Sequence, residues 1–164
     1  MKKIRLVATK ADLCFPEYWK IQVLERNVIL ATTLSRETAL VGTWELLSRE
    51  DRTPDGQRRE EPNLGSDPVA YLMYDATGHF AVQFMRRNRK GASASGGYDA
   101  YFGKYSVADG TVTQELIAAL SPENVGKVVT REFQIDGAEL IISLGATSSS
   151  GEPVTRTLRW KRLA

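Results

Sequence analysis

The sequence predicts an all-β domain, an eight-stranded antiparallel up-and-down barrel with a short N-terminal extension. Three observations favour this fold. From Gly42 onward the apolar residues recur with a period of two, turn sequences return about every ten residues, and the connections are almost all short. Because strands joined by tight turns pair with their chain neighbours, we expect a meander that closes on itself and leaves no exposed edge.

Eight segments carry the strand pattern, and turn residues separate them. The expected strands are 42–48, 69–74, 79–85, 101–107, 111–118, 127–135, 139–144 and 154–163. Asp75-Ala76-Thr77-Gly78 is typical of a tight hairpin between the second and third strands. The polar stretch 49–67 and the basic, Gly/Ser-rich stretch 86–97 predict surface loops. An eight-stranded barrel has an interior that holds packed side chains or one small ligand.

The first 39 residues do not follow this pattern. We therefore expect an N-terminal extension, residues 1–39, that is partly helical or disordered, followed by a barrel domain, residues 40–164. The apolar residues between positions 16 and 30 fit a helix or an additional strand. Ser35 is a candidate cap for a short helical turn that leads into the first strand.

Composition excludes several classes of function. No apolar run approaches the roughly 20 residues that span a bilayer, and the basic start lacks a continuous apolar segment, so we expect a cytoplasmic protein with no membrane span. Residues 1–39 hold seven Lys/Arg and four Asp/Glu, a charge of +3, whereas the remaining residues hold fifteen and sixteen, a charge of −1. A nearly neutral barrel lacks the basic field that a nucleic-acid binder needs. One cysteine, Cys14, and one histidine, His79, favour no disulfide framework and no metal site.

Two segments resemble the ends of lipocalin and calycin barrels. The first is Leu40-Val41-Gly42-Thr43-Trp44, and the second is Leu158-Arg159-Trp160-Lys161-Arg162. The resemblance implies that Trp44 plugs the closed end of the barrel and that Arg162, from the last strand, lies across its ring as a cation–π partner. Gly42, Trp44, Trp160 and Arg162 are thus the expected barrel-closing residues.

A more specific resemblance is to the bacterial lipocalin-like domain family, over about residues 40–163. It rests on the order and spacing of several short motifs. These are Tyr74-x-x-x-Gly78, Ala100-Tyr101-Phe102-Gly103-x-Tyr105, Gly110-Thr111-Val112-Thr113, Ser121-Pro122 with Val125-Gly126, Arg131-x-Phe133 and Asp136-Gly137-x-x-Leu140. Many relatives resemble Thr-Val-Thr-His-His where this chain has Gln114 and Glu115, and Gln114 cannot replace a histidine as a proton acceptor.

Arg131 is the principal candidate for a ligand contact. By alternation it shares a face with Val129, Phe133 and Ile135, which predicts the barrel interior. Because an interior cation needs a partner, Arg131 would anchor a ligand carboxylate or enolate, or else form an internal ion pair. If the two faces of the strand are assigned the wrong way round, Arg131 lies in solvent. Further candidate ligand-binding residues are Gln114, Tyr105, Tyr71, Met73 and Phe133, with the alternative that Tyr105 only packs and bonds a neighbour.

The predicted function is binding of a small, mainly hydrophobic molecule inside the barrel, without a cofactor and without a confident catalytic residue. One alternative is a cofactor-independent cyclase or isomerase that uses the same cavity. Another is a filled structural barrel that acts through its outer surface, for example as a homodimer. Bulky residues such as Met73, Phe133 and Trp160 filling the interior would favour this last alternative.

Overall fold

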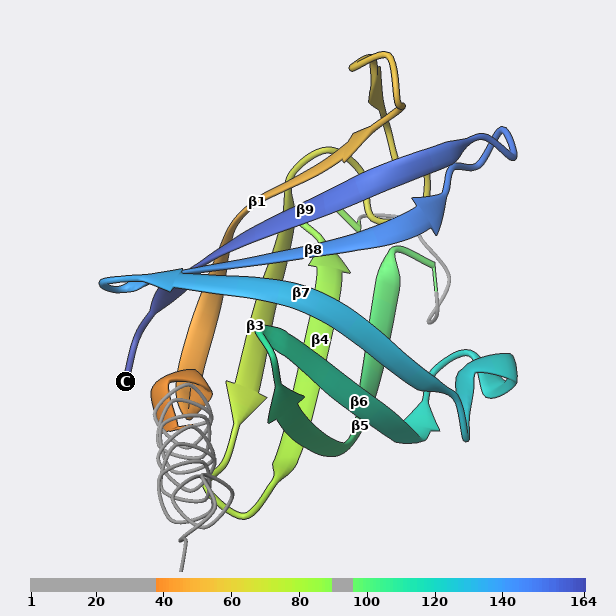
Figure 1. The fold of residues 1–164 in the computed structure, drawn as a ribbon. Coiled ribbons are helices and arrows are strands. Elements are labelled where there is room, and N and C mark those ends of the chain that lie inside the picture. The colour runs from red at the N-terminus through yellow and green to blue at the C-terminus, as the bar shows by residue number, and fades with distance from the viewer. Residues whose placement is uncertain (1–37, 90–95) are drawn as a thin grey trace, which may run out of the picture. The chain divides into compact units, whose positions relative to one another are not determined.

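The computed structural model describes residues 38–89 and 96–164, and Figure 1 shows their arrangement. The strands are β1 (Gly42–Arg52), β2 (Arg58–Arg59), β3 (Pro68–Tyr74), β4 (His79–Arg86), β5 (Tyr98–Ala108), β6 (Thr111–Ala119), β7 (Val128–Asp136), β8 (Glu139–Thr147) and β9 (Pro153–Arg162). A short 3₁₀ turn, η1 (Pro122–Asn124), lies between β6 and β7. All eight predicted strands are present, and β2 is an addition.

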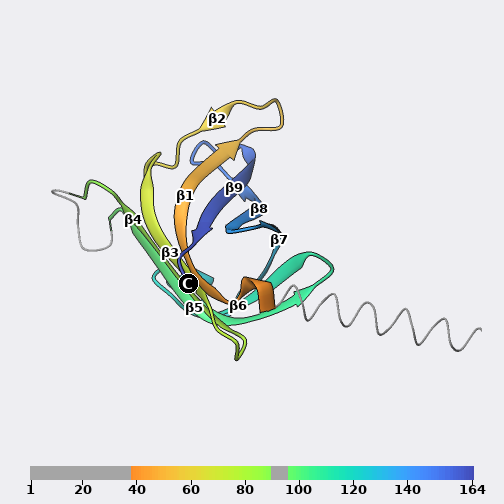
Figure 2. The same cartoon turned by 90° about the vertical axis from the view of Figure 1, so that its left-hand side faces the viewer.

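The sheet closes into a barrel because β1 pairs with two strands. It is antiparallel to β3 on one side and to β9 on the other, and the remaining strands pair in chain order. Figure 2 shows the resulting ring of strands. Trp44 marks the closure, since it is the register partner of both Leu72 on β3 and Arg162 on β9. The two residues of β2 pair only with the end of β1. The predicted eight-stranded antiparallel barrel is confirmed.

The largest departure from the predicted strands is the length of β1. It continues to Arg52, because its second half pairs with β9 as far as Thr155. Residues 49–52 were expected to begin a surface loop, and this expectation is wrong. In the same way, β5 begins at Tyr98 rather than at residue 101. Both extensions add charged residues, Asp51 and Asp99 among them, to one end of the barrel.

Two glycines permit close approaches that any side chain would block. Gly42 has a φ of 144°, and a Cβ there would overlap the carbonyl oxygen of Ala164 near the chain end. Gly103 lies where the β5–β6 register shifts, and a Cβ there would overlap the carbonyl oxygen of Glu115. Gly42 thus belongs to the barrel closure, as the family resemblance implies.

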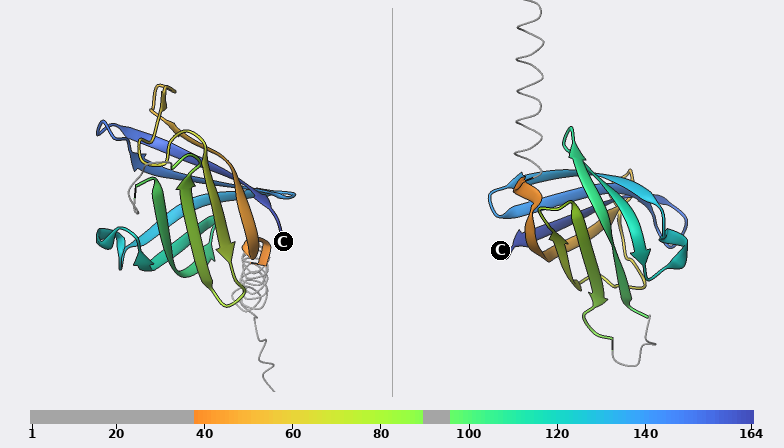
Figure 3. Two further views of the ribbon diagram at one scale, coloured as in Figure 1. Left: turned by 180° about the vertical axis from the view of Figure 1, so that it is seen from behind. Right: turned by 90° about the horizontal axis from the view of Figure 1, so that it is seen from below.

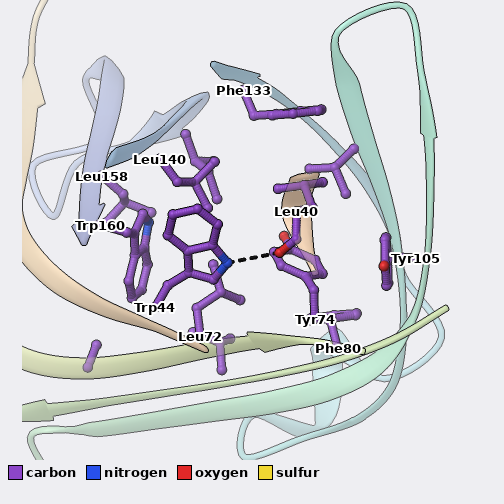
Figure 4. Packing of buried hydrophobic residues seen from close by; sticks show 14 of the residues in the cluster. Leu40, Trp44, Leu72, Tyr74, Phe80, Tyr105, Phe133, Leu140, Leu158 and Trp160 are labelled. Atoms are coloured by element: carbon purple, nitrogen blue, oxygen red, sulfur yellow. Dashed lines mark hydrogen bonds between the residues drawn. The ribbon is translucent and has the colours of Figure 1, made fainter. Parts of the chain in front are cut away.

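Aromatic and aliphatic side chains fill one half of the barrel interior, which we call the packed end. Leu40, Trp44, Leu140 and Trp160 are each no more than 1% exposed. Figure 4 shows them as part of one buried cluster that also contains Tyr74 and Phe133. Two of the residues whose presence in the interior would favour a structural barrel, Phe133 and Trp160, are therefore inside it.

The predicted N-terminal extension falls mainly on residues 1–37, which lie outside the described part of the chain. Residues 38–40 are helical and lead directly into β1. The expected boundary near residue 39 and the interpretation of the apolar segment 16–30 stay predictions. Within the described ranges, no helix has the length and apolar character required to cross a membrane.

Candidate functional site

The closure of the packed end depends on Trp44. Its indole Nε1 donates a hydrogen bond of 2.9 Å to the carbonyl oxygen of Leu40, drawn as a dashed line in Figure 4. The guanidinium carbon of Arg162 lies 4.1 Å from the centre of the Trp44 ring. Arg162 also donates to the carbonyl oxygens of Val41, at 2.7 Å, and Ala39. The contact between Trp44 and Arg162 that the resemblance implies is therefore present, and it also holds the segment that enters β1.

Gln114 and Tyr105, both predicted to contact a ligand, are buried at the packed end. The Gln114 amide donates to the hydroxyl of Tyr74 at 2.7 Å. The Tyr105 hydroxyl donates to the carbonyl oxygen of Asp75 at 2.8 Å, and its ring meets the Tyr74 ring edge-on at 4.7 Å. Burial raises the pKa of Tyr74, so its hydroxyl stays protonated. These contacts match the alternative in which Tyr105 packs and bonds a neighbour.

Arg131 lies on the interior face of β7, as alternation predicts. Its neighbour on that face, Phe133, is buried, while Thr130 and Glu132 point outward. The Arg131 Nη2 donates to the hydroxyl of Tyr101 at 3.2 Å, and the guanidinium carbon is 5.9 Å from the centre of the Tyr101 ring. Its Nη1 is buried and has no hydrogen-bond partner in residues 38–89 and 96–164. Arg131 is thus an interior cation with unused donor capacity.

The opposite half of the barrel interior is charged, and we call it the polar end; it comprises Arg49, Asp51, Asp99 and Arg156. Arg156 holds Asp51 in a two-pronged ion pair with distances of 2.8 and 2.7 Å. Arg49 lies 3.7 Å from Asp51 and 3.5 Å from Glu61. The side chains of Arg49 and Asp51 are only 7% and 4% exposed. The Nε of Arg49 is buried and has no partner among the described residues.

The pKa shifts show that Asp51 and Arg156 stabilise each other's charges, whereas the charge of Arg49 is disfavoured. Burial alone would raise the pKa of Asp51, but the hydrogen bonds and charge of Arg156 and the charge of Arg49 lower it overall. Burial, followed by repulsion from Arg156, lowers the pKa of Arg49. Asp51 is charged at neutral pH because its pKa lies below its usual acidic value. Arg49 is charged because an arginine pKa starts above 12. The polar end therefore holds a fixed ionic cluster.

Asp99 differs from the other acid in this cluster. Burial raises the pKa of its carboxyl, and the charge of Glu61 adds to this effect. The backbone N–H of Ala100 and the positive charges of Arg49 and Arg156 oppose the shift without cancelling it. A carboxyl with a raised pKa that lines a cavity next to cations is a candidate functional group.

Two adjacent cavities lie at the polar end. The inner one has a volume of about 50 Å³ and lies between the charged cluster and an apolar wall; its lining includes Arg49, Phe84, Asp99, Tyr101, Arg131, Leu144, Arg156 and Leu158. The outer one has a volume of about 270 Å³, and residues 60–63 and 147–149 form much of its lining. Arg49, Leu64, Asp99 and Arg156 line both cavities. The cavity that Arg131 lines is thus next to a larger cavity at the polar end.

The prediction that Tyr71 and Met73 line the interior is wrong. They alternate on β3 with the buried Ala70, Leu72 and Tyr74, and are 50% and 42% exposed. The tyrosine and the methionine therefore lie on the outer face of β3, the face seen in the left view of Figure 3. On the outer face of the next three strands, Phe102 is 53% exposed and lines a surface groove of about 260 Å³.

The sequence did not identify the four residues of the polar end. Arg49 and Asp51 were assigned to a polar loop, Asp99 to the residues before a strand, and Arg156 to the last strand with no role in the site. One signal was present: Arg156 is two residues before Leu158 and four before Trp160, which predicts one common face. No group of three or more His, Cys, Asp or Glu residues in the described ranges could hold a metal ion.

Comparison with known proteins gives a family and no assigned activity. A model of the lipocalin-like domain matches residues 41–163. No curated protein matches the chain. A crystal structure of an uncharacterized protein from Bacteroides eggerthii DSM 20697 is similar, with 17% sequence identity and a TM-score of 0.43, over 74% of this chain and 98% of that one. Since the family model spans three quarters of the sequence, the chain belongs to the lipocalin-like domain family.

Proposed function

We propose that this barrel binds a small molecule that has a carboxylate head and a short apolar body, at the polar end. The proposal narrows the predicted hydrophobic ligand to an amphipathic one. Its main support is that Arg131 Nη1 and Arg49 Nε, two buried guanidinium nitrogens without partners among the described residues, belong to side chains that line the same inner cavity. A carboxylate accepts hydrogen bonds from guanidinium groups in a favourable planar geometry.

The surroundings of the inner cavity fit the rest of such a ligand. Phe84, Leu144 and Leu158 supply an apolar wall, while Asp51 already neutralises much of the positive charge of Arg156. The cavities measure about 50 and 270 Å³, whereas pockets for drug-sized ligands measure about 300–1,000 Å³. The expected ligand is therefore small, and the packed end, which is filled by side chains, does not receive it.

Hexanoate and hexanamide are a matched pair of probes for this proposal, because they differ mainly in the charge of the head group. In isothermal titration calorimetry we expect hexanoate to bind at least about tenfold more tightly than hexanamide. The variant Arg131→Met should lose this preference. The variant Arg159→Met removes an arginine from the outer surface, where its side chain is 50% exposed, and should bind hexanoate like the unaltered protein.

The proposal fails if hexanoate does not bind at millimolar concentration, or if it binds Arg131→Met and the unaltered protein equally well. The alternative of a cofactor-independent enzyme stays a prediction. If it holds, Asp99 is a better acid–base candidate than Gln114, because its carboxyl lines both cavities and has a raised pKa.

A second candidate function is self-association through the outer face of β3–β6, in keeping with the predicted homodimer. The cross-strand rows Met73–Ala81–Phe102–Ala118 and Tyr71–Gln83–Ala100 contain no charged side chain. A second copy that contacts these two rows would therefore meet no like charge there, and a highly charged partner would find no opposite charge in them. Bulky exposed side chains beside an alanine-lined groove also allow the ridge of one copy to enter the groove of the other.

Sedimentation equilibrium tests this second candidate. We expect a dimer for the unaltered protein and a monomer for Phe102→Glu, because the introduced carboxylates would be buried at the contact. Thr155→Glu is the control: Thr155 is exposed on β9, which pairs with β1 and β8 and with none of the strands β3–β6, so the dimer should persist. A monomeric unaltered protein at concentrations of about 0.1 mM contradicts the candidate.

A further inference from the structure

Asp99 is a second polar group that a ligand at the polar end would meet. It lies near the start of β5 and lines both the inner and the outer cavity. In the described ranges, no side chain forms a hydrogen bond or an ion pair with its carboxyl, although the backbone N–H of Ala100 interacts with it. An acidic group in such a position can accept further hydrogen bonds.

The three arginines that line the inner cavity with Asp99 interact with other side chains. Arg156 gives two hydrogen bonds to Asp51, and Arg49 is shared between Asp51 and Glu61. Arg131, which lines the inner cavity with Asp99, donates to the hydroxyl of Tyr101 instead. The negative charge of Glu61 also acts on Asp99. Asp99 is therefore the least compensated acid of the polar end.

This arrangement restricts the head group of the ligand. A simple carboxylate bound to Arg131 would be repelled by Asp99, because both are anions in a partly buried cavity. A hydrogen-bond donor next to the ligand carboxylate would replace this repulsion with a charge-assisted hydrogen bond. An ammonium group could supply the donor, but Arg49, Arg131 and Arg156 would repel it. A hydroxyl group donates to Asp99 without adding positive charge.

We propose that Asp99 accepts a hydrogen bond from the ligand and that the site selects hydroxycarboxylates, whose hydroxyl group is one or two carbon atoms from the carboxylate. This inference rests on the proposed function, because it requires a carboxylate at Arg131. In this arrangement Arg131 and Arg49 contact the carboxylate, and Asp99 contacts the hydroxyl. Asp99 is thus a specificity-determining residue.

Calorimetric titration with hexanoate, both enantiomers of 2-hydroxyhexanoate and of 3-hydroxyhexanoate, and 2-aminohexanoate tests the inference. At least one hydroxy compound should bind the unaltered protein about tenfold more tightly than hexanoate. In Asp99→Leu, which removes the acceptor, this preference should disappear and hexanoate should bind more tightly than before. Asp99→Asn preserves the shape of the side chain and removes its charge, so it should strengthen hexanoate binding even if the leucine variant does not fold.

The outcomes separate this inference from the proposed function. If hexanoate and all four hydroxy compounds bind equally well to the unaltered protein, Asp99 does not select the ligand, although the carboxylate site remains. Tighter binding of 2-aminohexanoate than of any hydroxy compound would also overturn the choice of a hydroxyl donor. If none of the carboxylates binds, or if binding does not depend on Arg131, the proposed function itself is wrong.

Discussion

The two ends of this barrel interior are built from different kinds of side chain. At the packed end, Trp44, Leu140 and Trp160 exclude solvent, and Arg162 satisfies two backbone carbonyls while covering the Trp44 ring. At the polar end, Arg49 and Asp51 are nearly as deeply buried, but cavities remain beside them. Burial is thus similar at the two ends. Each end has a buried donor without a partner among the described residues, Trp160 Nε1 at the packed end and Arg49 Nε at the polar end, but the side chains of Arg49 and Arg131 also line a cavity.

The difference separates the source of stability from the candidate site. Apolar burial at the packed end contributes free energy in proportion to the area removed from water. Buried ions contribute little net stability, because desolvation offsets their attraction, yet removing one partner is costly. Substitutions at the packed end should therefore change mainly stability. At the polar end, the size of the stability loss should depend on whether the substituted residue has a partner.

The largest effect is expected for Trp44→Ala. The side chain is fully buried, so its loss should lower the free energy of unfolding by about 3–5 kcal/mol, measured by urea denaturation. Leu47→Ala on the same strand is the control, because Leu47 is 54% exposed and its loss should cost less than about 0.5 kcal/mol. Equal losses for the two variants would contradict the description of the packed end.

The second-largest loss of stability is expected for Asp51→Ala at the polar end. It leaves Arg156 and Arg49 buried without their common counter-ion and should cost about 3 kcal/mol. Because the pKa of Asp51 is lower in the folded than in the unfolded protein, its contribution is present above the unfolded value of about 4 and is lost as the pH falls through the folded value. Urea denaturation at pH 7 and at pH 3 should therefore show a smaller difference between variant and unaltered protein at pH 3.

Asp67→Ala is the control for this second prediction. Asp67 also pairs with an arginine, Arg87, but at the exposed surface, so the melting temperature should not change. A difference between Asp51→Ala and the unaltered protein that grows as the pH falls would contradict the assigned direction of the pKa shift.

A smaller decrease in the free energy of unfolding, about 2 kcal/mol, is expected for Arg162→Met. The variant removes the cation–π contact with Trp44 and the hydrogen bonds to the carbonyl oxygens of Val41 and Ala39. Thermal denaturation measures the effect, and Arg159→Met, which changes an exposed arginine of the same strand, should leave the melting temperature unchanged. A stable Arg162→Met variant would mean that Trp44 closes the barrel without its partner.

The smallest effect on stability is expected for Arg131→Met. A partly buried cation with unused donor capacity gives little net stability, so its replacement should change the free energy of unfolding by less than about 1 kcal/mol. Arg156→Met is the matched interior variant, and it should be clearly destabilising because it breaks the ion pair with Asp51. If Arg131→Met were the more destabilising of the two, Arg131 would have a structural role.

How well alternation in the sequence predicts which side chains point inward differs from strand to strand. In β7, uninterrupted alternation correctly placed Arg131 inside with Phe133. In β1, the register with β9 shifts between Leu46 and Ser48, so the inward series changes from Trp44 and Leu46 to Arg49 and Asp51. A bulge of this kind reverses the parity of every residue that follows it. Two residues of the polar end, Arg49 and Asp51, were therefore assigned to a loop.

By itself, the sequence determined the all-β class, the order of the eight strands and the pair of residues that closes the barrel, because a period of two, short turns and the family motifs are local features. The tertiary structure decided which residues meet inside. Asp51 and Arg156 are 105 residues apart, and only the closure of β1 on β9 makes them neighbours. Tyr71 and Met73 point outward for a related reason: alternation separates the two faces of a strand, but only curvature of the sheet decides which face becomes the interior.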